Sequence, residues 1–276
     1  MITVALTGPD GSGKSTLLEH ARHRPARSEL HVLGMADLTT LRTFPWAPAA
    51  AELHRLDEEA DRLGHPLLKA TITALLYALQ GRALQHLVPT VPPDSIWLLE
   101  RQPALDLVVY ATIYLAPGTA GNTPPGPWSA LPPHPRTEQW IAELLGPPGR
   151  LEDVFPRLRP FFAGAVDTVL AGLSGLFRQP FPELLVLCNL PEELLLQRGT
   201  TKDRREFHEH PEALALIRRT YLELTAALPR WYPGTTVERL DCSGPLEHTL
   251  ARFDQLLRAL RAANRADTAS SGSTQP

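Results

Sequence analysis

Cysteine, net positive charge and long apolar runs are all scarce in this 276-residue sequence, and each scarcity excludes a class of protein. The two cysteines, Cys188 and Cys242, stand in stretches that read as strands or strand ends. Two such residues do not make a disulfide framework, so we expect reduced core thiols in a cytoplasmic protein. The net charge is −3, which argues against nucleic acid as the main partner.

Membrane and metal signals are missing as well. No apolar run reaches the roughly 18 residues of a membrane span, and no basic segment precedes an apolar one at the N-terminus. We therefore expect neither a membrane-bound protein nor a signal peptide. The ten histidines do not have the Cys/His spacing of a structural zinc site. The length and the 43% of apolar residues suit one large α/β domain or one domain with an insertion.

Lysine is rarer than arginine, and one of the three lysines stands in the most informative stretch. Residues 2–6 read as a short buried strand, and residues 8–16 follow with the sequence GPDGSGKST. A helical apolar pattern then covers residues 15–23. This is the pattern G-x-x-x-x-G-K-[ST] of a phosphate-binding loop, in the strand–loop–helix setting that the motif requires.

The motif predicts how a nucleotide is held. Glycines let the loop turn its N–H groups inward, and the next helix directs its N-terminus at the same anion. Lys14 can reach the β- and γ-phosphates, and the Ser15 hydroxyl can hold Mg²⁺. We predict an ATP site built from Gly8, Asp10, Gly11, Ser12, Gly13, Lys14, Ser15 and Thr16.

The rest of the chain alternates strands with helices. Strands are expected at 29–35, 95–99, 184–188 and 236–241, and helices at 49–63, 66–87, 105–115, 137–145, 160–177, 211–228 and 246–263. The pattern predicts an α/β fold with a five-stranded parallel sheet flanked by helices. We expect one domain over residues 1–263, with a Pro-rich insertion at about 116–160 and a disordered tail at 264–276.

A carboxylate and a guanidinium follow the strand expected at 95–99. In an open parallel sheet, ligands bind beyond the carboxyl ends of the strands. Glu100 can bind Mg²⁺ or accept a proton from a hydroxyl, and Arg101 can hold a phosphate or position an acceptor. A surface ion pair is the alternative. Asp106 and Tyr110 share one face of the next helix.

Two further stretches offer candidates. Asp37 and Arg42 follow the second strand and suit a pocket, although an ordinary connecting loop is an equal interpretation. A charged run at about 198–210 includes Arg198 and Arg204. Cations over a transferred phosphoryl group suit a closing lid, so we predict both arginines to be catalytic; a solvated face is the alternative.

Together these motifs resemble the thymidylate kinase and deoxynucleoside kinase superfamily. The stretch at 8–16 looks like the thymidylate kinase form of the loop. Residues 198–206 and 221–224 are similar to that family's lid and following helix, and residues 240–246 to its last strand and adenine loop. The resemblance covers roughly residues 1–262, less the insertion.

Two departures separate the sequence from thymidylate kinases. Glu100-Arg101 stands where those enzymes have Asp-Arg, and their Arg-Glu-Pro-Gly-Gly segment after the second strand is missing. The Glu-Arg pair, with Asp106 and Tyr110, resembles the deoxynucleoside kinases, in which the Arg and the Asp lie near the nucleoside.

The resemblance implies a P-loop NTPase fold of the nucleoside monophosphate kinase type, with ATP and Mg²⁺ as cofactors. Transfer to dTMP is the favoured reaction, and phosphorylation of a deoxynucleoside 5′-hydroxyl is the alternative. A nucleotide-binding regulator and a kinase of another small metabolite stay open, as does a homodimer. The implied residues are Lys14, Glu100, Arg101, Arg198 and Arg204 for catalysis, Ser15 and Glu100 for Mg²⁺, and Asp37, Arg42, Arg101, Asp106 and Tyr110 for the acceptor.

Overall fold

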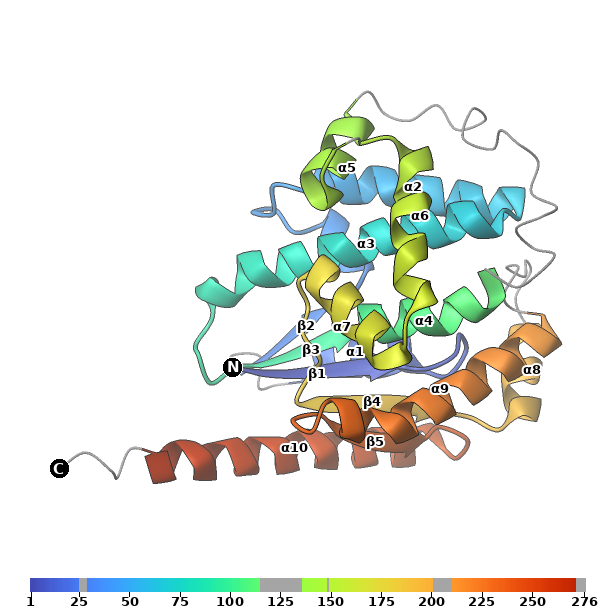
Figure 1. Ribbon diagram of the computed structural model, residues 1–276. Helices are drawn as coiled ribbons and strands as arrows, with labels where there is room; N and C mark the ends of the chain where they lie inside the picture. Colours follow the sequence, from blue (N-terminus) through green and yellow to red (C-terminus); the bar gives the residue numbers. More distant parts are fainter. Residues whose placement is uncertain (25–28, 115–135, 148, 201–209, 272–276) are drawn as a thin grey trace.

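The computed structural model describes residues 1–24, 29–114, 136–147, 149–200 and 210–271 (Figure 1). Its strands form one parallel sheet in the order β2-β3-β1-β4-β5. They are β1 (Ile2–Thr7), β2 (Leu30–Leu33), β3 (Ile96–Glu100), β4 (Leu184–Asn189) and β5 (Thr236–Asp241). The predicted α/β fold with a five-stranded parallel sheet is therefore confirmed.

The central strand, β1, explains why the sheet is covered on both sides. Ile2, Val4 and Leu6 point to one face, where they pack with α1 (Lys14–Arg22) and α10 (Leu246–Ser271). Ala5 points to the other face and joins the larger core. Because side chains alternate along a strand, a strand that is apolar at successive positions needs cover on both faces.

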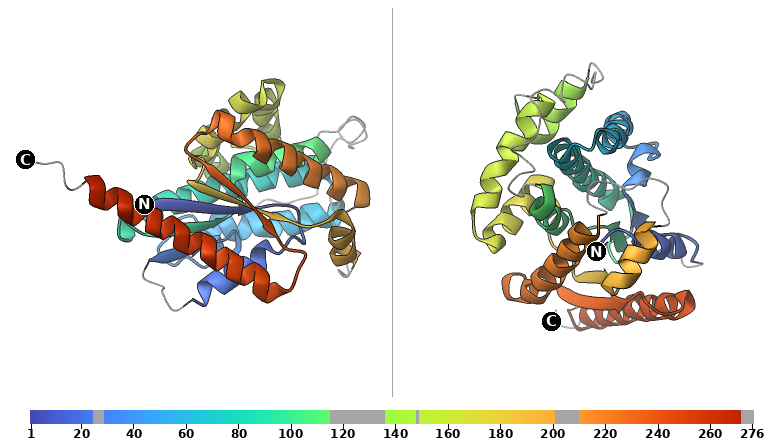
Figure 2. Two further views of the ribbon diagram at one scale, coloured as in Figure 1. Left: turned by 90° about the horizontal axis from the view of Figure 1, so that it is seen from below. Right: turned by 90° about the vertical axis from the view of Figure 1, so that its right-hand side faces the viewer.

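The larger core lies under a layer of helices on the second face (Figures 1 and 2). The helices that contribute to it include α2 (Ala47–Leu63), α3 (Pro66–Leu87), α4 (Pro103–Tyr114), α7 (Val166–Phe177) and α9 (Pro211–Trp231). Helix α3 contacts α2, α4 and α7, which explains its apolar residues on most sides. The remaining elements are α5 (Thr137–Leu145), α6 (Leu151–Leu158), α8 (Glu192–Thr200), and the short 3₁₀ turns η1 (Ala36–Thr39), η2 (Val88–Thr90) and η4 (Arg159–Ala163).

The Pro-rich part of the chain is more helical than expected, and one predicted helix there is wrong. The stretch expected as an insertion over about 116–160 contains α6 in addition to the expected α5; the buried Val154 and Leu158 anchor α6 despite the proline between them. The helix expected over 160–177 is divided into η4 and α7 by extended backbone at Gly164. The break allows the Phe161 ring to pack on Gly172, where a Cβ would lie 2.8 Å from it. Residues 116–135 lie outside the described residues.

The C-terminal prediction also needs correction. Helix α10 continues to Ser271, so the disordered tail expected from residue 264 is wrong for residues 264–271. This stretch has no apolar stripe, but its alanines and arginine are strong helix formers that extend the helix before it. Residues 272–276 lie outside the described residues. No helix within the described ranges has the length and apolar character to cross a membrane.

The close approach of α3 to the end of α7 gives a test of the packing. A Cβ on Gly81 of α3 would lie 1.8 Å from the carbonyl oxygen of Phe177. We expect Gly81→Ala to lower the free energy of unfolding by about 3 kcal/mol, because one helix must shift. Gly175→Ala is the matched control, because Gly175 lies on an exposed face of α7 with nothing within 4 Å of the added Cβ. It should be neutral or stabilising by up to about 1 kcal/mol. Urea denaturation measures both, and equal effects would contradict the packing described.

Candidate active site

The loop between β1 and α1, residues 8–13, is called the glycine loop below. Gly8, Gly11 and Gly13 have φ values of 138°, 79° and 98°, in the region that glycine adopts without strain. A Cβ on Gly8 would lie 2.5 Å from the carbonyl oxygen of Cys188. The glycine loop therefore lies directly against the carboxyl end of β4, in a conformation that other residues would strain.

Several donors around the glycine loop have no acceptor among the described residues. The first N–H groups of α1, beginning at Lys14, have no carbonyl in a preceding helical turn, and no side chain caps the helix at Gly13. The Ser12 hydroxyl is buried without a hydrogen-bond partner in the described part of the chain. Converging N–H groups at a helix N-terminus suit an anion, so the glycine loop fits a phosphate group.

Lys14 lies across this loop. Its buried Nζ donates to the carbonyl oxygens of Gly8 at 2.8 Å and Pro9 at 2.7 Å, and it lies 3.6 Å from Oδ1 of Asp10. Burial, together with the charge of Arg101, lowers the pKa of Lys14, while Asp10 opposes the shift. A phosphate bound in the loop would favour the charged ammonium and raise this pKa again.

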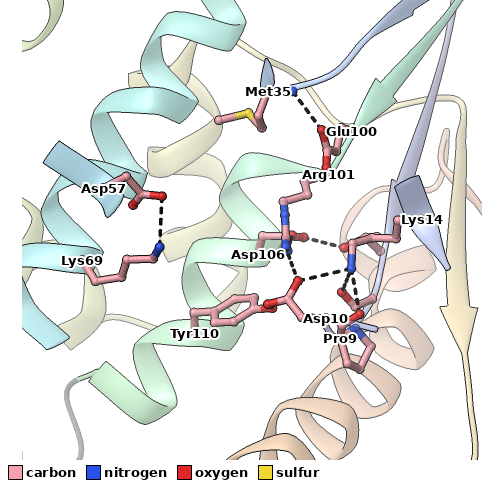
Figure 3. A network of polar contacts seen from close by, with 12 residues as sticks. Pro9, Asp10, Lys14, Met35, Asp57, Lys69, Glu100, Arg101, Asp106 and Tyr110 are labelled. Carbon is pink, nitrogen blue, oxygen red and sulfur yellow. Dashed lines mark hydrogen bonds and ion pairs between the residues drawn. The ribbon is translucent and has the colours of Figure 1, made fainter. Parts of the chain in front are cut away.

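Arg101 is the centre of a group of ionic contacts at the end of β3. Its guanidinium donates to Asp10 at 2.5 Å and to Asp106 at 2.8 Å, and it lies 5.5 Å from the ring centroid of Tyr110. The Tyr110 hydroxyl donates to Asp10 at 2.8 Å (Figure 3). These four residues are the Arg101 network. Because Asp10 belongs to the glycine loop, the network joins that loop to β3 and α4.

The backbone of Arg101 is strained. Its φ of 68° is in the left-handed region, which costs a residue with a side chain about 1–3 kcal/mol. The backbone N–H donates to the Leu6 carbonyl of β1 at 2.7 Å. Strain of this kind persists only where surrounding contacts hold it, and it concentrates at functional sites.

Asp106 holds the far side of the guanidinium. It is fully buried and also accepts a hydrogen bond from the Thr7 hydroxyl. Burial raises the pKa of Asp106, and the charge of Arg101 opposes that shift. Asp106 lies outside the lining of the cavity described next, so its contacts position Arg101.

A cavity of about 270 Å³ lies beside the network, at the carboxyl end of β3. It is called the β3 cavity. Its lining comes from the glycine loop, the segment after β2, the end of β3 with the residue that follows it, and the helices α2, α3 and α4: Asp10, Met35, His54, Asp57, Lys69, Thr73, Leu76, Tyr77, Glu100, Arg101, Tyr110 and Tyr114. The volume is slightly below the range of about 300–1,000 Å³ that is typical of small-molecule sites. Four of these residues, Asp10, Glu100, Arg101 and Tyr110, were predicted from the sequence as site residues.

Glu100 lines the β3 cavity and lies beside Met35 in Figure 3. Its Oε2 accepts from the backbone N–H of Met35 at 2.9 Å, and its own carbonyl accepts from Gln80 at 2.6 Å. These two contacts hold Glu100 at the junction of β2, β3 and α3. A carboxylate fixed in this way can bind a cation or accept a proton.

The structure does not bring Asp37 and Arg42 into this cavity. Asp37 accepts from Arg22 of α1 and from the backbone N–H of Gly34, both at 2.6 Å, and so ties the end of β2 to α1. A Cβ on Gly34 would lie within 3.2 Å of Arg22, Glu100 and Asp37. Arg42 is exposed on the following loop.

Ser15 and Thr16 are exposed on the first turn of α1. They line a second, open depression on the α1 side of the molecule, so Ser15 and Glu100, both predicted Mg²⁺ ligands, do not share one cavity. Arg198 of α8 crosses the glycine loop and donates to the carbonyl of Gly11 at 3.1 Å. Arg204 and most of the predicted lid at 198–210 lie outside the described residues.

One wall of the β3 cavity was not predicted from the sequence patterns. Asp57 and Lys69 belong to α2 and α3, whose charged residues read as ordinary surface positions, and only the packing of the two helices brings them together. Tyr77 of α3 is buried and also lines the cavity.

No protein-family model matches this sequence, and its comparison with curated proteins found no match. The function is therefore inferred from the chemistry of the site.

The buried ion pair between Asp106 and Arg101 should stabilise the fold. Asp106→Ala leaves a largely buried guanidinium with one carboxylate, and we expect it to lower the free energy of unfolding by about 3–5 kcal/mol. Asp37→Ala is the comparison: it also removes a carboxylate from an arginine, but at a more exposed site, and should cost about 1 kcal/mol. Chemical denaturation gives both values. A cost for Asp106→Ala no larger than that for Asp37→Ala would contradict this role of the network.

Proposed function

We propose that the chain is a P-loop phosphotransferase that uses ATP and Mg²⁺ to phosphorylate a nucleoside or nucleotide. The observation that carries the proposal is the position of Asp10, which belongs to the glycine loop and also lines the β3 cavity. A loop suited to phosphate and a cavity suited to a small molecule are thus neighbours. They lie at the carboxyl end of β1, where the strand order reverses and where α/β proteins bind ligands.

The nucleotide would use the groups around the glycine loop. Its phosphates would accept hydrogen bonds from the first N–H groups of α1 and from Lys14, replacing the loop carbonyls to which Lys14 now donates. The Ser15 hydroxyl on the first turn of α1 would supply an oxygen ligand for Mg²⁺, which when bound would neutralise charge on the transferred group. Arg198, which already lies over Gly11, supplies a further positive charge.

The charges in the β3 cavity favour a hydroxyl over a phosphate as the acceptor. Its two described cations, Arg101 and Lys69, are each bonded to two carboxylates already. A further carboxylate that lines the cavity, that of Glu100, is present to accept the proton of a hydroxyl. In this reaction the hydroxyl oxygen forms a bond to the γ-phosphorus of ATP, the bond to ADP breaks, and the proton passes to Glu100.

Phosphorylation of dTMP, the reaction that the resemblance to thymidylate kinases favours, is the competing hypothesis. It needs a free cation to hold the phosphate of the acceptor. The Arg101 network would have to exchange one of its carboxylates for that phosphate.

ADP release in a coupled assay, with Mg²⁺-ATP and a panel of nucleosides and nucleoside monophosphates, tests the proposal. We expect turnover on nucleosides, and a loss of about 100- to 1,000-fold in kcat for Lys14→Ala because the developing phosphate charge loses its cation. Circular dichroism and thermal unfolding must show that the variant is folded.

Each outcome of the panel has a separate meaning. Turnover on dTMP alone would support the monophosphate reaction, and turnover on nucleosides alone would make Glu100→Gln the next variant. A folded Lys14→Ala protein with full activity would overturn the proposal. ATP binding without turnover on any acceptor would also overturn it and would favour a nucleotide-binding regulator.

A further inference from the structure

The sequence has two cysteines, and the fold brings them together at the carboxyl end of the sheet. Cys188 is near the end of β4, and Cys242 directly follows the neighbouring strand β5. Both thiols are free, and that of Cys188 donates a hydrogen bond to the sulfur of Cys242. Two contacting thiols in a chain with no other cysteine are a candidate for oxidation to a disulfide.

The strand register explains the contact between the two sulfurs. Cys188 pairs with Leu240, and the backbone N–H of Cys242 donates to the carbonyl of Asn189 at 2.9 Å. Because residues two apart on a strand point to the same face, Cys242 is a diagonal neighbour of Cys188. Its sulfur lies 3.5 Å from the carbonyl oxygen of Leu240, the residue opposite Cys188.

Cys242 is the thiol that an oxidant reaches first. It is 5% exposed, against 0% for Cys188, and its neighbours Asp241 and Ser243 are exposed. The hydrogen bond from Cys188 and the charge of Arg198 lower the pKa of Cys242, although burial opposes them. The same hydrogen bond and burial raise the pKa of Cys188. A thiolate beside a cation is the reactive form, and hydrogen peroxide is small enough to approach a nearly buried sulfur.

The backbones of both cysteines hold the glycine loop. The carbonyl oxygen of Cys188 lies against Gly8, where an added Cβ would approach it to 2.5 Å. The carbonyl oxygen of Cys242 accepts from Arg198 at 3.2 Å, and Arg198 also donates to the carbonyl of Gly11. A movement of these two strand ends therefore reaches the glycine loop from two sides.

A disulfide would require such a movement. In an ideal parallel ladder, the Cα atoms of diagonal neighbours are about 8 Å apart. A disulfide joins Cα atoms that are roughly 4.4–6.8 Å apart. The ends of β4 and β5 must therefore approach each other when the bond forms. Since the Cys188 carbonyl is in contact with Gly8, this approach displaces the glycine loop.

We propose that Cys188 and Cys242 are an oxidation site, at which a peroxide forms a disulfide that displaces the glycine loop. The Cys242 thiolate attacks one peroxide oxygen, the O–O bond breaks, and the departing hydroxide takes up the proton that the thiol released. The sulfur of Cys188 then attacks the sulfenic sulfur of Cys242, the S–O bond breaks, and the hydroxyl leaves as water with the Cys188 proton. Two thiols and one hydrogen peroxide thus give one disulfide and two waters.

Oxidation should also weaken nucleotide binding. The affinity for Mg²⁺-ATP should fall by about 10- to 100-fold, because small displacements of positioning groups have effects of this size. This consequence rests on the proposed function, whereas the disulfide and the displacement of the glycine loop do not.

The test compares reduced protein with protein treated with hydrogen peroxide and then with N-ethylmaleimide, which blocks any free thiol. We expect the treated protein to take up no maleimide and to give one cross-linked peptide that contains Cys188 and Cys242. Amide hydrogen exchange at residues 8–13 should become faster, because Gly8 loses its contact with β4. Dithiothreitol should reverse both changes. Calorimetric titration with Mg²⁺-ATP gives the affinity of each form.

Three variants are the controls. Cys242→Ala cannot form the disulfide, so peroxide should change neither the exchange of the glycine loop nor the affinity for ATP. Cys188→Ala should stop at the sulfenic acid of Cys242, which dimedone traps. Met35→Leu removes the methionine that lines the β3 cavity and should keep the full response to peroxide. The comparison of oxidised and reduced wild-type protein needs no variant and stands if a cysteine variant fails to fold.

Failure of this inference can be distinguished from failure of the proposed function. Two free thiols after peroxide treatment, a sulfinic acid without a cross-link, or a disulfide that leaves the exchange of the glycine loop unchanged would overturn the inference alone. A response that persists in Cys242→Ala would also overturn it. A disulfide that displaces the glycine loop in a protein that binds no ATP even when reduced would support the inference and overturn the proposed function.

Discussion

The geometry of the site depends on one largely buried guanidinium held between two carboxylates. Arg101 bonds to Asp10 on one side and to Asp106 on the other, and these contacts hold its backbone in a strained left-handed conformation. Removing either carboxylate would leave a poorly compensated buried charge. The network therefore fixes the distance between the glycine loop, β3 and α4, and with it the shape of the β3 cavity.

Polar groups in two places near the Arg101 network lack hydrogen-bond partners among the described residues. The first N–H groups of α1 and the Ser12 hydroxyl lack acceptors among the described residues, and Oδ1 of Asp57 lacks a donor there. The first group suits an anion. In the proposed function the phosphates of a nucleotide satisfy it, so an arrangement that costs folding stability is one that binds a ligand.

Much of the local structure was predictable because it depends on neighbours in the sequence. The glycine loop follows from its spacing of glycines, and α3 and β5 have the bounds expected from their apolar patterns. The sequence patterns were insufficient where contacts between distant residues decide the structure. Helix α6, which was not predicted, is anchored by Val154 and Leu158, and the helix predicted over 160–177 is divided into η4 and α7 so that Phe161 can pack on Gly172. Helix α10 extends past Ala263 without an apolar stripe, which a search for amphipathic periodicity cannot detect.

Residues that are neighbours in the chain were enough to predict the parallel α/β architecture, the turn that the glycine loop must make and the Glu100-Arg101 pair at a strand end. Each of these features has a local sequence pattern. Contacts between distant elements, by contrast, establish that Asp106 supports Arg101 from behind, that Asp37 ties β2 to α1, and that Asp57 meets Lys69 across two helices. Ionic partners of this kind are chosen by how helices pack on the sheet, and a charged residue on a helix has the same local pattern whether it faces a cavity or the solvent.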